Sequence, residues 1–254
     1  MDLEIAVTSA AGAGTSAAEG ANRIELCGAL ELGGITPSQG LLEASMEHVD
    51  GRLGIHALVR CRPGDFHYSA SDVDTMVHEI RHVLALGADG VVVGALTHDG
   101  EVDVPVIRRL VDSARQTRPD AHVTFHRAID QSQDPLRALE QLLELGFTRV
   151  LTSGHEATAG AGLATLSRLV ERSAGKIQIM AGGGLKLSDI PAMHAAGLSA
   201  VHLSAKRTVS TVADQTVSLG SQDGEDPTAY TVTDRETVRA ARAAVNAVNL
   251  RSRI

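Results

Sequence analysis

One joint recurs along this chain: a helix-like run ends at a glycine, and an apolar strand-like run begins three residues later. The four copies centre on Gly20, Gly87, Gly146 and Gly197. Glycine suits the left-handed position just beyond a helix because it has no Cβ to clash with the backbone. The apolar run that follows can then enter a buried parallel strand. Helix, glycine and strand in repeated order predict an α/β protein.

The number of strand-like runs and the chain length point to a barrel. A chain of 254 residues has the size of one (β/α)8 unit. Eight strands are expected, at Leu3–Ser9, Arg23–Gly28, Gly54–Arg62, Gly90–Leu96, His122–Asp130, Arg149–Gly154, Lys176–Gly184 and Ala200–Lys206. We therefore predict an α/β fold of the (β/α)8 TIM-barrel type, with residues 1–254 as a single domain. A doubly wound open sheet is the alternative, disfavoured because no nucleotide-type glycine-rich turn follows the first strand.

Helical patterns lie between the expected strands. The clearest are Ser71–Leu86, Val104–Thr117, Pro135–Leu145 and Leu163–Ser173, with starts at Ser71 with Asp74 and at Asp134. The first connection, 10–20, is rich in small residues and allows only a short helix. Residues 208–233 have no clean period and are expected to form an irregular excursion. A closing helix then occupies 234–254, most clearly over Asp234–Asn249.

The composition excludes several classes of partner. The formal net charge is −8 and no basic cluster stands out, so we expect no nucleic-acid partner. No apolar run approaches the roughly 20 residues that span a bilayer, and we expect no membrane partner. The chain enters a strand pattern directly, without a signal peptide, and its two cysteines form no disulfide framework. These features predict a cytoplasmic protein in a reducing compartment.

Polar side chains share one face of several expected strands. Because side chains alternate across a strand, the apolar face should pack under the helices and the polar face should point into the barrel lumen. The inward set is Glu4, Glu25, Cys27, Arg60, Arg62, His126, His202 and Ser204. Active sites of this fold are assembled from the carboxyl ends of several strands, which favours a functional site at that mouth. The alternative is a structural network of glutamates paired with arginines.

Within that set, individual residues suggest roles. Glu25 and His126 are the candidate catalytic residues, as general acid or base. Arg60 and Arg62 could hold a carboxylate or phosphate, and Arg60 should meet Glu25 on the neighbouring strand. The glycines that end the seventh strand could bind a second anionic group together with Ser204; they are Gly182, Gly183 and Gly184. The alternative for these glycines is a tight turn that needs them only for geometry.

Several stretches together resemble the CutC family, which is named for copper homeostasis. They span about residues 3–206 in order. The stretches are Arg23-Ile24-Glu25-Leu26-Cys27-Gly28, Gly33-Gly34-Ile35-Thr36-Pro37-Ser38, 87–97, Thr124-Phe125-His126-Arg127-Ala128, Leu151-Thr152-Ser153-Gly154 and Ile179-Met180-Ala181-Gly182-Gly183-Gly184. The resemblance implies a (β/α)8 barrel, a cytoplasmic protein with a role in copper handling, and Cys27 as the copper ligand. Ser153 joins the ligand-binding candidates. The family usually reads Arg-Pro-Arg where this chain has Arg60-Cys61-Arg62, so Cys61 inherits no role.

Two functional hypotheses follow. The first is a CutC-like cytoplasmic copper-homeostasis protein that binds Cu(I), a soft ion suited to thiolate, through Cys27. The second is a TIM-barrel enzyme, a lyase, isomerase or hydrolase, acting at the C-terminal mouth on a small anionic metabolite, phosphorylated ones included. The second hypothesis gives a small anionic ligand as the partner and needs no organic cofactor. The sequence leaves the oligomeric state open, with a homo-oligomer as one outcome.

Overall fold

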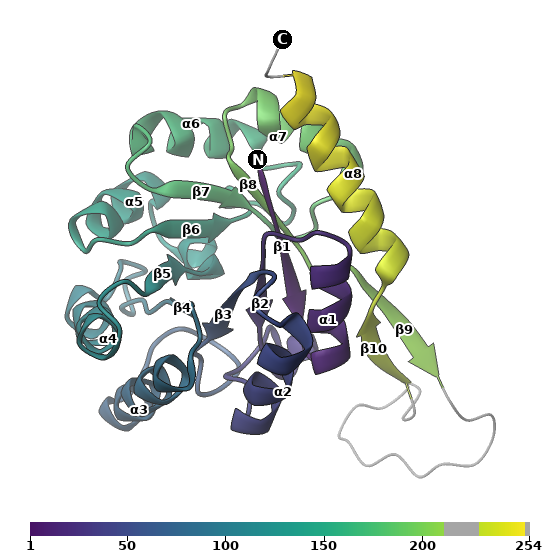
Figure 1. Ribbon diagram of the computed structural model, residues 1–254. Coiled ribbons are helices and arrows are strands. Elements are labelled where there is room, and N and C mark those ends of the chain that lie inside the picture. The colour runs from purple at the N-terminus through teal and green to yellow at the C-terminus, as the bar shows by residue number, and fades with distance from the viewer. Residues whose placement is uncertain (211–228, 252–254) are drawn as a thin grey trace.

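The computed structural model describes residues 1–210 and 229–251, and its centre is a closed barrel of eight parallel strands (Figure 1). The strands pair in chain order, and β8 closes onto β1. They are β1 (Asp2–Val7), β2 (Arg23–Leu26), β3 (Gly54–Leu58), β4 (Gly90–Val93), β5 (His122–Phe125), β6 (Arg149–Thr152), β7 (Gln178–Ala181) and β8 (Ala200–Leu203). The predicted barrel is confirmed, and the four joint glycines all have positive φ angles.

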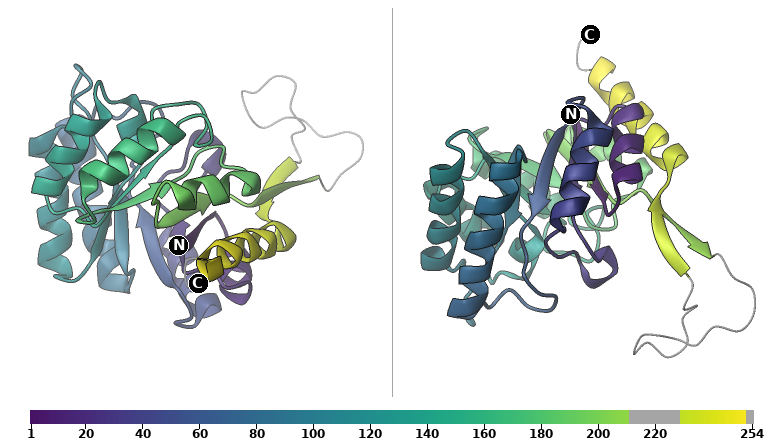
Figure 2. Two further views of the ribbon diagram at one scale, coloured as in Figure 1. Left: turned by 90° about the horizontal axis from the view of Figure 1, so that it is seen from above. Right: turned by 60° about the horizontal axis from the view of Figure 1, so that its bottom comes forward.

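The helices surround the strands (Figure 2). They are α1 (Ala10–Ala18), α2 (Gln39–Val49), α3 (Ala70–Leu86), α4 (Val104–Thr117), α5 (Pro135–Glu144), α6 (Leu163–Ser173), α7 (Ile190–Ala195) and α8 (Arg235–Arg251). The four clearest helices are confirmed, but α3 begins earlier than predicted. Its cap is Ser69, whose hydroxyl accepts from the Asp72 N–H while Asp72 accepts from the Ser69 N–H. Helix α2 was not predicted, because its buried positions include Ser45 and so weaken the apolar period.

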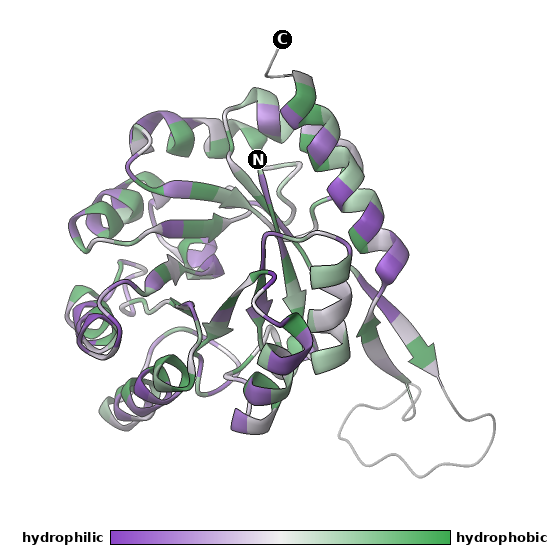
Figure 3. Cartoon of the chain, in the orientation of Figure 1, coloured by the Kyte–Doolittle hydropathy of each residue, from purple (hydrophilic) through white to green (hydrophobic). Residues whose placement is uncertain are grey.

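Two cores result from the alternation of side chains. The main core packs the outer faces of the strands against the helices, which carry both hydrophobic and hydrophilic residues (Figure 3). The lumen holds two small apolar clusters, of which one contains Cys27, Leu58 and Val92. The barrel interior also holds a polar layer in which Arg23 donates from Nε to Glu4 at 2.5 Å. The expected pairing of glutamate with arginine therefore occurs, at Glu4 and Arg23.

The strands are shorter than the sequence suggests. β3 ends at Leu58, β5 ends at Phe125, and a 3-10 helix, η2 (Arg127–Gln131), begins directly after His126. Arg60, Arg62 and His126 therefore lie in loops beyond the strand ends, where strict alternation no longer fixes the direction of a side chain.

Residues 206–233 do not form a wholly irregular excursion. β9 (Lys206–Ser210) and β10 (Ala229–Thr233) pair as an antiparallel arm that extends away from the barrel (Figures 1 and 2). At both described ends of the segment, alternating Thr and Val pair across the arm. Residues 211–228 lie outside the described part. Within the described part, no helix has both the length and the apolar character needed to cross a membrane.

Close packing between β4 and β5 makes one glycine a sensitive test of the barrel. A Cβ added at Gly90 would lie 2.5 Å from the His122 carbonyl oxygen, which the strand ladder holds in place. Gly90→Ala should lower the free energy of unfolding by about 3 kcal/mol. The matched control is Gly40→Ala in α2, where a Cβ meets nothing within 4 Å and should add about 0.5 kcal/mol. Urea unfolding measures both, and equal stabilities would contradict the packing.

Candidate functional site

A cavity of about 570 Å³ opens at the C-terminal ends of the strands, where the mouth site is expected. Its polar lining includes Glu25, Arg60, His126, Arg127, His202 and Lys206. These side chains come from β2, from the loops after β3 and β5, from β8 and from the start of β9. The cavity therefore gathers residues that are far apart in the sequence, and it has the size of a small-metabolite site.

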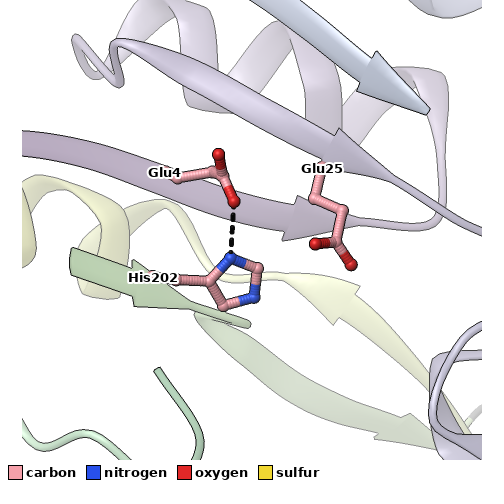
Figure 4. Close-up of side chains that lie close together, drawn as sticks. All are labelled: Glu4, Glu25 and His202. Atoms are coloured by element: carbon pink, nitrogen blue, oxygen red, sulfur yellow. Dashed lines mark hydrogen bonds and ion pairs between the residues drawn. The ribbon is translucent and has the colours of Figure 1, made fainter. Parts of the chain in front are cut away.

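Three adjacent strands, β8, β1 and β2, bring His202, Glu4 and Glu25 together (Figure 4). The His202 Nδ1 and the Glu4 Oε1 are 2.8 Å apart and form a hydrogen-bonded ion pair. The other Glu4 oxygen accepts from Arg23. The Glu25 carboxylate lies beside this pair, and its Oε2 is buried with no hydrogen-bond partner.

The charges in this group set the ionisation of each member. Burial opposes ionisation of Glu4, but the His202 hydrogen bond and the Arg23 charge hold its pKa well below the usual range. Burial also disfavours a charged His202, yet the bond to Glu4 and the charges of Glu25 and Glu4 raise its pKa. Burial raises the pKa of Glu25 to about 7, with His202 opposing and Glu4 reinforcing the shift. Glu25 thus exchanges protons near neutral pH.

His126 is held as a neutral ring. Its Nδ1 accepts a hydrogen bond from the Ala128 N–H, so the proton of the neutral ring is on Nε2. Burial and the nearby Arg60 charge lower its pKa to about 3. Phe66 packs against the ring at 4.8 Å between centroids, and Nε2 is buried without a partner. His126 can therefore donate a hydrogen bond but is a poor proton carrier near pH 7.

Arg60 lines the cavity but does not pair with Glu25 as expected. Its guanidinium donates to the carbonyls of Leu32, Gly34 and Gly64, which joins the loops after β2 and β3. Carbonyls of these two loops therefore take the bonds that were expected to go to Glu25 on β2. Its Nε is buried and has no hydrogen-bond partner. Arg60 therefore has a structural role, and its buried Nε–H is left without an acceptor.

The glycine loop after β7 lies partly in the cavity wall. Gly183 and Gly184 line the cavity, as does Ser204, whereas Gly182 donates its N–H to the Thr152 carbonyl and is not part of the lining. A Cβ at Gly183, whose φ is +93°, would lie 2.6 Å from the Arg127 Cζ. Glycine is therefore needed here because the Arg127 guanidinium lies against the backbone.

Two ligand-binding candidates lie away from the cavity lining. Arg62 forms ion pairs with Asp65 and Asp72 and lies over the Tyr68 ring. Ser153 donates its hydroxyl to the Glu156 carbonyl and accepts from Arg127, so it supports the cavity wall indirectly.

Cys27 does not fit a Cu(I) site in the folded protein. Its side chain is fully buried beside Leu58 and Val92, and its nearest polar partner is the Val7 carbonyl at 3.8 Å. Burial, with Glu25 and Glu31, raises the pKa of the thiol, so the thiolate that copper requires is disfavoured. Cys27 is also absent from the cavity lining.

Two other arrangements carry metal-type donors. Among the described residues, Glu4, Glu25 and His202 form the one group of three with donor atoms within 4.8 Å of one another. Both Glu4 oxygens already accept hydrogen bonds, which leaves only part of their lone-pair capacity for a cation. The sequence also contains the zinc-type spacing His78-Glu79-x-x-His82, which sequence reasoning overlooked. Both histidines are exposed on α3, and Glu79 is bonded to Thr36.

Sequence reasoning missed several residues of the cavity. Glu4 and His202 were in the inward set but were given no role. Their position on the lumen-facing side of their strands was the signal that could have identified them. Arg127 was given no role, because β5 was expected to continue to Asp130 with His126 facing inward. Lys186, also in the lining, lies in the loop after β7, where no periodic signal exists.

Comparison with known proteins gives the family. The CutC family model matches residues 1–207. A CutC protein of Histophilus somni is 38% identical over 245 residues, which cover 95% of this chain and 98% of that protein. A CutC protein of Xanthomonas axonopodis pv. citri is 43% identical over 210 residues, 82% of this chain and 85% of that protein.

A solved structure agrees with these matches. CutC from Streptococcus agalactiae, whose description names copper homeostasis, superposes with a TM-score of 0.74 at 25% identity. The superposition covers 80% of this chain and 98% of that one. With the sequence matches, it shows that the chain belongs to the CutC family.

Proposed function

We propose that the mouth cavity binds a small organic anion and that Glu25 transfers a proton to or from it. The supporting observation is a set of three buried polar atoms without partners, all on cavity-lining residues. They are Glu25 Oε2, Arg60 Nε and His126 Nε2. Buried polar groups are nearly always hydrogen-bonded, so three unpaired atoms around one cavity favour a missing ligand.

The charge of the lining favours an anion. Arg60, Arg127, Lys186 and Lys206 line the cavity, and Glu25 is its only acidic lining residue within the described chain. Arg127 is paired with Asp130, which leaves the other three cations to act on a ligand. A carboxylate or phosphate bound among them would gain electrostatic energy, because the site is partly desolvated.

Glu25 is suited to general acid–base chemistry. A carboxyl with a pKa of about 7 is present in both protonation states at neutral pH. Burial raises this pKa, and the charges of His202 and Glu4 shift it in opposite directions. In this role Glu25 would take a proton from a carbon or hydroxyl of the ligand and return it at another atom, which is isomerase or lyase chemistry.

His126 and Arg60 would stabilise the negative charge that forms. The His126 ring and the Arg60 guanidinium are fixed by their other bonds, so a ligand that reaches the buried Nε2–H and Nε–H meets donors that are already oriented. This assigns His126 to hydrogen-bond donation by a neutral imidazole, in place of the acid–base role expected from the sequence.

Copper handling is the second candidate, because the description of the Streptococcus agalactiae relative names copper homeostasis. The buried, protonated Cys27 does not support Cu(I) binding by the native fold. We also propose a cytoplasmic location, since both cysteines are free thiols and a reducing compartment keeps them so.

The first test is a thermal-shift screen of carboxylated and phosphorylated metabolites, followed by solvent deuterium exchange of each hit. The parent protein should bind a hit and exchange a ligand proton, while Glu25→Gln should bind it but exchange about 100-fold more slowly or less. Glu31→Gln, an exposed carboxylate outside the cavity lining, is the matched control. A Glu25→Gln protein that exchanges at the parent rate would refute the proposal.

Glu25 should also make stability depend on pH. Its pKa is raised on folding from 4.5 to about 7, so the folded state holds a proton that the unfolded chain releases between these values. The stability of the parent relative to Glu25→Gln should therefore be greatest below pH 4.5 and fall as the pH rises to 7, by up to about 1.4 kcal/mol per pH unit. Urea unfolding of both proteins across this range measures it. If the stability of the parent relative to Glu25→Gln instead rises with pH, Glu25 is ionised in the folded protein.

Copper binding is tested by competition with a Cu(I) chelator. If Cys27 is as inaccessible as its burial indicates, the reduced parent and Cys27→Ala proteins should retain equal copper under native conditions. Cys61→Ala is the matched control, because Cys61 is only partly buried. A loss of copper confined to Cys27→Ala would restore Cys27 as the ligand.

A further inference from the structure

A second cavity lies at the opposite end of the barrel. It has a volume of about 420 Å³ and is formed where β2 to β6 begin, so the barrel interior separates it from the mouth. Arg149, His56, His122 and Gly54 belong to its wall. None of these residues takes part in the proposed function.

Arg149 is the unusual member of this wall, because it is a buried cation without an acidic partner. It is 7% exposed. Its Nε donates to Gln178 at 2.5 Å, and its Nη1 donates to His56 at 3.1 Å and to Thr124 at 3.0 Å. All three partners are neutral, whereas Arg23 in the same layer pairs with Asp2 and Glu4. A buried guanidinium left uncompensated is costly, and burial lowers the pKa of Arg149 to about 10.

Donors remain free toward the cavity. Among the described residues, Nη2 of Arg149 has no hydrogen-bond partner. This atom is also not fully buried, so it is accessible from the cavity. His56 receives the Arg149 bond on Nδ1, which places the proton of its neutral ring on Nε2. Gly54 leaves that side of the ring open, since even a Cβ there would be 3.9 Å from Nε2.

The acidic groups of the wall are committed elsewhere. Asp89 accepts from the Ile55 N–H at 2.9 Å and lies 3.6 Å from Arg118, and Asp120 lies 3.3 Å from the same arginine. Arg118 thus lies beside both carboxylates, and neither of them pairs with Arg149.

We propose that this cavity binds a small oxyanion, a phosphate ion or the phosphoryl group of a metabolite, held by Arg149 Nη2 and His56 Nε2. The anion compensates the buried guanidinium, so its binding stabilises the barrel from the end opposite the mouth. Nη2 carries two N–H groups, so together with the His56 Nε2–H it can donate to separate oxygens of one phosphate.

Thermal unfolding of the full chain with inorganic phosphate, at ionic strength held constant with chloride, tests this site. The parent should show a saturable rise in Tm, of about 5 to 10 °C at about 100 times the Kd. A parallel titration with glycerol phosphate distinguishes the sources: a response to phosphate indicates the free ion, and a response to the ester alone indicates a metabolite. Either response supports an oxyanion site, and no saturable response to either would overturn it.

Variants locate the bound anion. Gly54→Asp and His122→Glu each add a carboxylate to the wall without removing a bond of Arg149, and either should abolish the phosphate response. Gly54→Ala adds only a methyl group at ordinary contact distance and should retain the phosphate response. Lys186→Ala, which changes the lining of the mouth cavity, should also retain the phosphate response. If both acidic variants respond like the parent, or if Lys186→Ala alone loses the response, the anion binds elsewhere and the proposal is wrong.

Discussion

The buried carboxylate of Glu4 is the charge on which the interior of this barrel depends. It has no solvent exposure, so its ionised form exists only because Arg23 and His202 donate to its two oxygens. This pairing aligns three neighbouring strands, and it fixes which nitrogen of His202 is turned away from Glu4. Burial, reinforced by the negative charge of Glu4, raises the pKa of Glu25 to about 7. The structural network and the candidate active site thus share residues. The two alternatives that the sequence offered therefore do not exclude each other.

From Glu4 the polar layer continues toward the other end of the barrel. Arg23 also donates to Gln178, and Gln178 accepts from Arg149, which in turn donates to His56. At the end opposite the mouth, Asp2 pairs with Arg23, so Arg149 is left without an acidic partner. Each end opens into its own cavity.

Sequence patterns predicted the barrel well, because the joint glycines and the apolar runs reflect local rules of backbone and burial. The inward direction of Glu4, Glu25 and His202 was also accessible, since all three lie within regular strands. Prediction failed for residues beyond the strand ends. Arg60 donates to loop carbonyls, and Arg62 pairs with Asp65 and Asp72. Arg127 lies in the cavity wall. Loop geometry depends on contacts between distant segments, which a periodic pattern does not encode. The family resemblance proposed Cys27 as a copper ligand, but only the packing around it shows its burial.

The protonation state of Glu25 in the ligand-free protein is the most direct test of this account. Infrared difference spectra between the parent and Glu25→Gln isolate the carboxyl C=O band of this residue. The account predicts that the band persists through mildly acidic pH and disappears with a midpoint at about pH 7. A band already absent at about pH 5, where an ordinary glutamate is ionised, would contradict it.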